Sequence, residues 1–130
     1  MLFRSGATTV RSMLGRNHHL GVRDKVLSGE ILGPTLYLAS PPFSGARVSD
    51  PDAAATLTKQ YSEQGWDLLK ILPGLRRPVF DAIARQAAIS GIEFSGHVPR
   101  EVGLERALSS GLRTIEHLDG YVREIGRAHV

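Results

Sequence analysis

The sequence predicts an α/β fold, in the form of an incomplete (β/α)8 barrel, from two observations. Short apolar runs of strand length alternate with segments of helical period along the chain, which is typical of a parallel sheet with right-handed crossovers. No glycine-rich phosphate loop of the dinucleotide or P-loop kind follows an early run, which favours a barrel over an open nucleotide-binding sheet. Because five strands cannot close a barrel, we expect the chain to be part of a larger one.

Each expected strand is bounded by glycine or proline. Residues 8–13 follow Gly6 and are rich in β-branched side chains, which favours a strand. Residues 35–39 lie between Gly33-Pro34 and Pro41-Pro42. The three later runs each begin with a glycine of the kind that ends a helix. The expected strands are residues 8–13, 35–39, 66–72, 92–97 and 113–118.

The expected helices have capping signals and an apolar face. Ser49-Asp50-Pro51-Asp52 combines a capping residue, a proline in the first turn and early acids, and predicts a helix that ends near Gly65. Phe80, Ile83 and Ala87 lie on one face of the next helix. The expected helices are residues 19–27, about 50–65, 78–90 and 101–110.

Composition limits the class of protein. Of 130 residues, 42% are hydrophobic and 22% are charged, which indicates a soluble globular protein. There is no cysteine, so disulfides and thiolate metal sites are excluded. No apolar run approaches the roughly 18 residues of a membrane span and no secretory signal is visible, so the default expectation is cytoplasmic. The net charge of +3 comes from scattered Lys and Arg, which argues against a nucleic-acid surface.

Three of the expected strands end in a residue that can bind a metal: Lys70, His97 and His117. In parallel α/β folds the functional groups gather at the carboxyl ends of the strands, so these residues predict one shared site. Neutral imidazole is a common ligand of zinc and similar divalent metals. The alternative, which the spacing leaves open, is that both histidines are hydrogen-bonded structural residues. Glu116 faces away from His117 in an extended strand, which favours a packing or salt-bridge role.

Lys70 ends an otherwise apolar strand, and burial there would disfavour its charged form. A neutral lysine can act as a nucleophile or base, or react with carbon dioxide to form a carbamate that bridges metal ions. The alternative is an ammonium group that pairs with Asp67 or Glu93 or reaches solvent. Arg100, in the loop after His97, is a candidate to bind a substrate carboxylate, although the residues alone favour a solvated loop arginine.

Five motifs follow one another in a fixed order and spacing. They are Gly6-Ala7-Thr8-Thr9-Val10-Arg11, Gly33-Pro34-Thr35-Leu36-Tyr37, Asp67-Leu68-Leu69-Lys70-Ile71, Gly96-His97-Val98-Pro99 and Ile115-Glu116-His117-Leu118. Together they resemble the metal-dependent amidohydrolase superfamily, most closely its imidazolonepropionase-like branch, which includes enzymes similar to prolidases. The resemblance covers about residues 1–123.

The resemblance implies strands two to six of a (β/α)8 barrel with a metal centre at its mouth. Lys70 matches the fourth-strand lysine that is carboxylated and bridges the metals in binuclear members, and His97 and His117 match the fifth- and sixth-strand ligands. The implied cofactors are two divalent ions, zinc by default with manganese or cobalt as alternatives. The implied reaction is hydrolysis of a carbon–nitrogen bond in a small amide, cyclic amide or dipeptide by a metal-activated hydroxide. The full-length enzyme could also form a homo-oligomer.

Several family features are missing from the sequence. The first-strand His-x-His pair is absent, Asp119 is too close to His117 to be the eighth-strand aspartate, and Ser12 stands where relatives usually have aspartate. The chain supplies three of six expected metal-site residues, so we expect it to be inactive by itself. The competing hypothesis is a non-catalytic α/β binding module whose histidines are structural.

We expect two segments of different origin. Residues 1–124 should form one partial barrel domain, with the true start upstream of Met1 and two strand edges open to aggregation. Residues 125–130 resemble the translation of a widely used sequencing-library adapter, so we expect a non-native tail in which His129 has no role.

Overall fold

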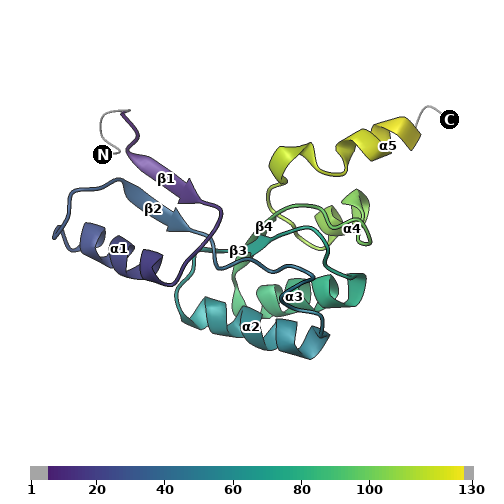
Figure 1. The fold of residues 1–130 in the computed structure, drawn as a ribbon, viewed down its shortest axis with the longest axis horizontal. Coiled ribbons are helices and arrows are strands. Elements are labelled where there is room, and N and C mark those ends of the chain that lie inside the picture. Colours follow the sequence, from purple (N-terminus) through teal and green to yellow (C-terminus); the bar gives the residue numbers. More distant parts are fainter. Residues whose placement is uncertain (1–5, 128–130) are drawn as a thin grey trace.

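The computed structural model describes residues 6–127, in which short strands alternate with helices (Figure 1). The elements are β1 (Thr9–Ser12), α1 (His18–Leu27), β2 (Thr35–Leu38), α2 (Pro51–Glu63), β3 (Leu68–Ile71), α3 (Arg77–Ser90), β4 (Glu93–Gly96), α4 (Leu104–Ser109), a 3₁₀ turn (Glu116–Leu118) and α5 (Tyr121–Arg127). The expected α/β alternation is confirmed up to β4. His129 lies outside the described residues. None of the described helices is long and apolar enough to span a membrane.

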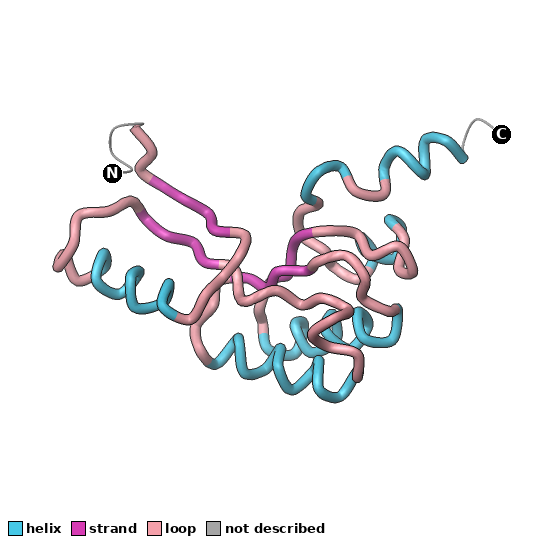
Figure 2. Tube along the Cα trace, in the orientation of Figure 1, coloured by secondary structure: helices cyan, strands magenta, loops and turns pink. Residues whose placement is uncertain are grey.

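The strands are parallel and follow one another in chain order (Figure 2). β1 pairs with β2, and β3 pairs with β4. Single parallel bridges, Ala39 to Leu68 and Phe43 to Ile71, connect the chain after β2 to β3. The Ser40 N–H donates to the Leu68 carbonyl at 2.8 Å across this junction. The carboxyl ends of neighbouring strands therefore lie at one edge, where the sequence places its candidate ligands.

The expected fifth strand, 113–118, is wrong in its second half. Ile115 makes a single parallel bridge to Gly96 of β4, so the run does continue the order of the sheet. His117 and Leu118 then have φ values of 58° and 57°, in the left-handed region that an extended strand does not use. The extended backbone ends before them, and alternation of side chains cannot be carried through to His117.

The hydrophobic core lies between β3, β4 and the helices α2 and α3, which pack side by side below these strands in Figure 1. Leu69 and Ile71 of β3 face this core and are fully buried, beside Phe80 and Ile83 of α3. Because side chains alternate along a strand, Lys70 lies on the opposite face of the sheet. The helices therefore cover one face and leave the other to polar side chains.

Candidate metal centre

Lys70 is buried in the middle of β3, with 4% of its surface exposed. Its backbone N–H donates to Ser40 Oγ at 3.2 Å, which ties β3 to the chain after β2. Burial lowers the pKa of Lys70, and the negative charge of Glu116 opposes part of this effect. The amine of Lys70 makes no hydrogen bond or ion pair with any residue of the described part of the chain. Lys70 is therefore a largely buried residue without an ion-pair partner, and its charged form is disfavoured.

The alternative partners of Lys70 are bound to other residues. Asp67 accepts from Arg23 Nη1 at 2.9 Å, and Glu93 lies 3.3 Å from Arg113 Nε. Neither carboxylate makes a contact with Lys70. In the structure these carboxylates pair with arginines of α1 and of the segment after α4, so of the alternative roles for Lys70 only an ammonium that reaches solvent stays open.

Gly96 determines the course of the chain into His97. It has a φ of 138°, and a Cβ at this position would lie 2.2 Å from the Ile71 carbonyl oxygen. With glycine there, β4 approaches β3 closely enough for the His97 N–H to donate to that same oxygen at 3.0 Å. The backbone of His97 is therefore fixed beside Ile71, the last residue of β3, which directly follows Lys70.

The two histidines lie next to each other. The ring centroids of His97 and His117 are 5.1 Å apart, and the rings are tilted by 33°. Asp119 Oδ2 lies 2.6 Å from His97 Nδ1. Since a carboxylate can only accept, we assign the ring proton to Nδ1, which places the lone pair of the neutral ring on Nε2. A metal-ligating histidine is commonly oriented in this way by a carboxylate on its other nitrogen.

The donor set fits part of a metal centre. Two adjacent imidazoles, one oriented by Asp119, and the amine of the largely buried Lys70 on the neighbouring strand are suitable chemistry for a divalent ion. Within residues 6–127, however, no group of three or more His, Asp or Glu side chains is arranged to hold a metal. The described residues by themselves therefore offer an incomplete set of ligands.

Arg100 lies beside the strand ends. It lines a cavity of about 310 Å³ together with Asp119, the residue that contacts His97. Pro73 and Gly74 of the loop after β3 and Pro99 of the loop after β4 complete part of the wall. None of the three candidate ligands lines this cavity, so its link to them is Asp119.

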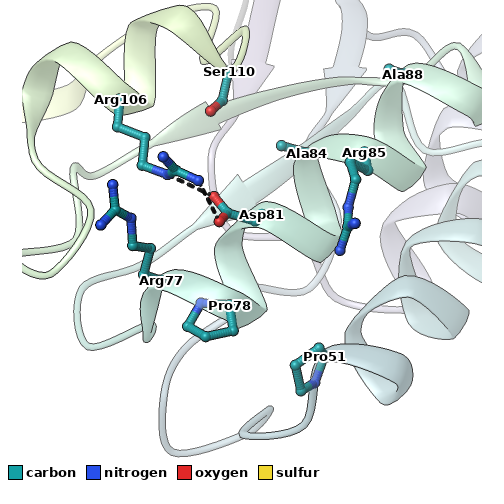
Figure 3. Close-up of a pocket in the computed structure, with 9 residues that line it drawn as sticks. All are labelled: Pro51, Arg77, Pro78, Asp81, Ala84, Arg85, Ala88, Arg106 and Ser110. Carbon is teal, nitrogen blue, oxygen red and sulfur yellow. Dashed lines mark hydrogen bonds and ion pairs between the residues drawn. The ribbon is translucent and has the colours of Figure 1, made fainter.

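A larger cavity, of about 750 Å³, lies elsewhere, among α3, α4 and the start of α2 (Figure 3). There Asp81 accepts from Arg106 Nε at 2.9 Å and from Nη2 at 2.6 Å. Neither Lys70 nor the two histidines line this cavity. We therefore place the candidate site at the strand ends rather than in this larger cavity.

Comparison with known proteins finds similar solved structures but no similar sequence family. No family model matches the sequence, and no curated protein matches it. In structure, the chain matches a bottromycin amidohydrolase with a TM-score of 0.85 and 28% identity, over 97% of this chain and 30% of that protein. A protein described as a prolidase from Bifidobacterium longum matches with a TM-score of 0.72 and 25% identity, over 89% of this chain and 34% of that one. The structural neighbours of the present chain are therefore amidohydrolases.

A third structure, a Xaa-Pro dipeptidase with bound methionine in its active site, supports the fold alone. It matches with a TM-score of 0.70 and 23% identity, over 88% of this chain and 38% of that protein. The resemblance to amidohydrolases that the five motifs indicate is confirmed. The chain spans 30% to 38% of the length of these three proteins.

Asp119 is the residue of the candidate site that sequence reasoning does not find. It follows His117 by two residues, within Leu118-Asp119-Gly120, and the sequence excludes it only as the eighth-strand aspartate. The only signal in the sequence is an acidic residue two positions after the candidate ligand His117. Its partner His97 is 22 residues away, and the turn that joins them is not readable from periodicity.

Proposed function

We propose that this chain is the central part of a metal-dependent hydrolase that acts on carbon–nitrogen bonds of small amides, cyclic amides or dipeptides. The observation that carries the proposal is the adjacency of His97 and His117 at the carboxyl ends of parallel strands. Lys70, the last residue but one of β3, is largely buried on the neighbouring strand. A fold shared with a bottromycin amidohydrolase supports the same conclusion.

We place the strands as the second to sixth of a (β/α)8 barrel. Four parallel strands and the extended residues before Glu116 follow in chain order, as neighbouring strands of such a barrel do. Helices α2 and α3 cover the face that would be the outside of the barrel. Lys70 then lies on the inner face, near the end where functional residues gather.

We propose that Lys70 becomes a carbamate, which would be one of the groups that hold two divalent ions. The lone pair of the neutral amine forms a bond to the carbon of carbon dioxide, one carbon–oxygen π pair moves to oxygen, and the amine releases a proton. The lowered pKa of Lys70 increases the fraction of neutral amine at a given pH, which favours this step. The product is an anion at the end of β3, suited to hold cations.

The other side chains bind and orient. His97 and His117 would each offer a ring nitrogen to the metal ions, with Asp119 holding the proton of His97 on Nδ1. Bound divalent ions, by default zinc, supply activation of water and polarisation of the scissile carbonyl. Arg100 would bind a carboxylate of the substrate through its planar guanidinium. Residues 6–127 offer too few ligands for this chemistry, so we expect the 130-residue chain alone to be inactive.

The test is metal content and hydrolysis in the full-length protein, purified with zinc. His97→Ala and His117→Ala should each lower bound metal, and each should reduce hydrolysis of a panel of dipeptides and cyclic amides by at least about 100-fold. His18→Ala is the matched control, because His18 is exposed and its ring contacts that of His19 rather than the ring of His97 or His117. A full-length protein without bound metal, or one indifferent to both substitutions, would contradict the proposal.

The second candidate is a non-catalytic α/β binding module with structural histidines. It is favoured by the hydrogen bond from His97 to Asp119, which satisfies one ring nitrogen without a metal. It is also consistent with the incomplete ligand set of the described residues. Under this hypothesis the unsubstituted protein binds no metal, and His97→Ala lowers only its stability. The measurement of metal content therefore separates the two candidates.

A further inference from the structure

Arg11 connects the first strand to the last extended segment across the inner face of the sheet. It lies in β1, whereas its partners are 103 and 105 residues away in sequence. Its Nη1 donates to Thr114 Oγ1 at 3.2 Å, and its Nη2 donates to Glu116 Oε1 at 3.2 Å. Thr114 Oγ1 in turn donates to the same Glu116 oxygen at 3.3 Å, which closes a triangle of polar contacts.

The segment held by this triangle has backbone partners on one side only. The Gly96 N–H donates to the Thr114 carbonyl at 3.1 Å, and the Arg113 N–H donates to the Phe94 carbonyl at 2.9 Å. Both partners belong to β4. On the opposite side of residues 113–115, no strand of the described part of the chain pairs with it. Side-chain contacts are therefore the second restraint on its position.

His117 follows Glu116 directly, and its backbone is in an unfavourable conformation. Its φ of 58° lies in the left-handed region, which a residue with a Cβ occupies only when its surroundings hold it there. The next residue, Leu118, has a φ of 57° and is 70% exposed, so packing of its side chain offers little restraint. The residue fixed before His117 is Glu116, through Arg11.

We propose that Arg11 is a positioning residue for His117. By fixing Glu116 and Thr114, it sets where the chain leaves the sheet, and so holds the His117 ring beside that of His97. This inference rests on the proposed function, in which His117 binds a metal. The side chains of Arg11 and Glu116 are 43% and 23% exposed, so their ion pair adds little to the free energy of unfolding. Its role is to fix the position of Glu116.

The direct test measures the distance between the two rings without metal. The full-length protein, stripped with a chelator and labelled at histidine, should show a nuclear Overhauser effect between the His97 and His117 rings, whose centroids are 5.1 Å apart. Arg11→Met should abolish this effect, and Arg11→Lys, which keeps the positive charge, should retain part of it. Glu116→Gln should weaken it, since the charge that holds Arg11 is removed.

Arg113→Met is the matched control. It removes an arginine from the same segment, together with its 3.3 Å contact to Glu93, but leaves the Arg11 triangle intact. The inter-ring effect should survive in this variant. An unchanged effect in Arg11→Met, or an equal loss in Arg113→Met, would overturn the proposal.

Zinc affinity provides the second readout. In the full-length protein, Arg11→Met should lower affinity about 10-fold to 100-fold, as for other residues that orient a ligand, and Arg113→Met should not. If the unsubstituted protein binds no zinc, the proposed function fails, whereas the ring measurement still decides whether Arg11 positions His117. Zinc affinity unchanged by Arg11→Met in a zinc-binding protein would overturn the positioning role.

Discussion

Gly96 is the residue whose identity the site depends on most directly. Its φ of 138° is accessible to glycine and strained for other residues, and an added Cβ would lie 2.2 Å from the Ile71 carbonyl oxygen. That oxygen accepts the His97 N–H, so β3 cannot move away without breaking this contact. The close approach of the two strands and the placement of His97 therefore require the same glycine.

Gly96→Ala should lower the free energy of unfolding by on the order of 3 kcal/mol, because backbone strain and a clash with β3 act together. Gly91→Ala is the control: Gly91 also has a positive φ, 66°, but nothing lies within 4 Å of its added Cβ. Its cost should be about 1 kcal/mol, from backbone strain alone. Urea unfolding of both variants measures the difference, and equal costs would show that the contact with Ile71 is unimportant.

The sequence predicts the positions of the three candidate ligands better than it predicts the residues that contact them. Lys70, His97 and His117 each end an apolar run, and the strand order of the structure does bring those ends to one edge. Asp119 and Arg11 are not found as site residues, since their contacts join residues 22 and about 100 positions apart through side chains in turns or in another strand. Periodicity carries no information about such contacts.

At the scale of elements, predictions that rest on capping chemistry agree with the structure. Asp50 accepts from the Ala53 N–H at 2.8 Å at the start of α2, as its position before Pro51 indicates. The wrong element is the last strand, because local sequence favours extended residues after Gly111 but cannot show that His117 turns into the left-handed region. Helix α5 is not expected from the sequence either.

Asp81 joins α3 to α4 through its paired contact with Arg106. The hydrogen bond from Arg106 lowers the pKa of Asp81 below its usual value of 3.8, partial burial opposes this effect, and the charges of Arg106, Arg77 and Arg85 add to it. Because the folded-state pKa lies below the unfolded one, the stabilisation is complete above the usual value. It is lost as the pH falls through the folded-state pKa.

Asp81→Asn should therefore unfold at a lower temperature than the unsubstituted chain at pH 7, and the difference should shrink as the pH falls below about 4. The pair is partly exposed, so added salt should reduce the difference at pH 7. Asp24→Asn is the control, since Asp24 is exposed and its carboxylate makes no contact with the described residues. Thermal unfolding at pH 7, 5 and 3 measures both variants; a difference that persists at pH 3 would contradict the assignment.

At the scale of the whole molecule, the sheet has two open edges among the described residues. One is β1, which pairs only with β2, and the other is residues 113–115, which pair only with β4. Edges of this kind invite strands of other chains. The two edges differ, so one edge of a molecule can pair with the other edge of the next molecule. Such head-to-tail contacts do not close and can continue from chain to chain. We therefore expect the 130-residue chain to form growing assemblies at micromolar concentration.

Thr9→Pro should convert this open-ended assembly into dimers or monomers. The Thr35 N–H donates to the Thr8 carbonyl, so alternate residues of β1 face β2 and the Thr9 N–H faces the open edge. Proline there removes a donor from the edge without removing a bond within the sheet. The edge at 113–115 would remain, but it could pair only with its own copy, which ends growth at two chains.

Sedimentation velocity of the unsubstituted chain and of Thr9→Pro at several concentrations would measure this change. Val10→Pro is the comparison, because the same alternation directs the Val10 N–H toward β2, and its loss should loosen β1 and increase assembly. An unsubstituted chain that stays monomeric at all concentrations would show that these edges are protected. Growth unchanged by Thr9→Pro would mean that assembly proceeds through another surface, such as Leu32, which is 92% exposed.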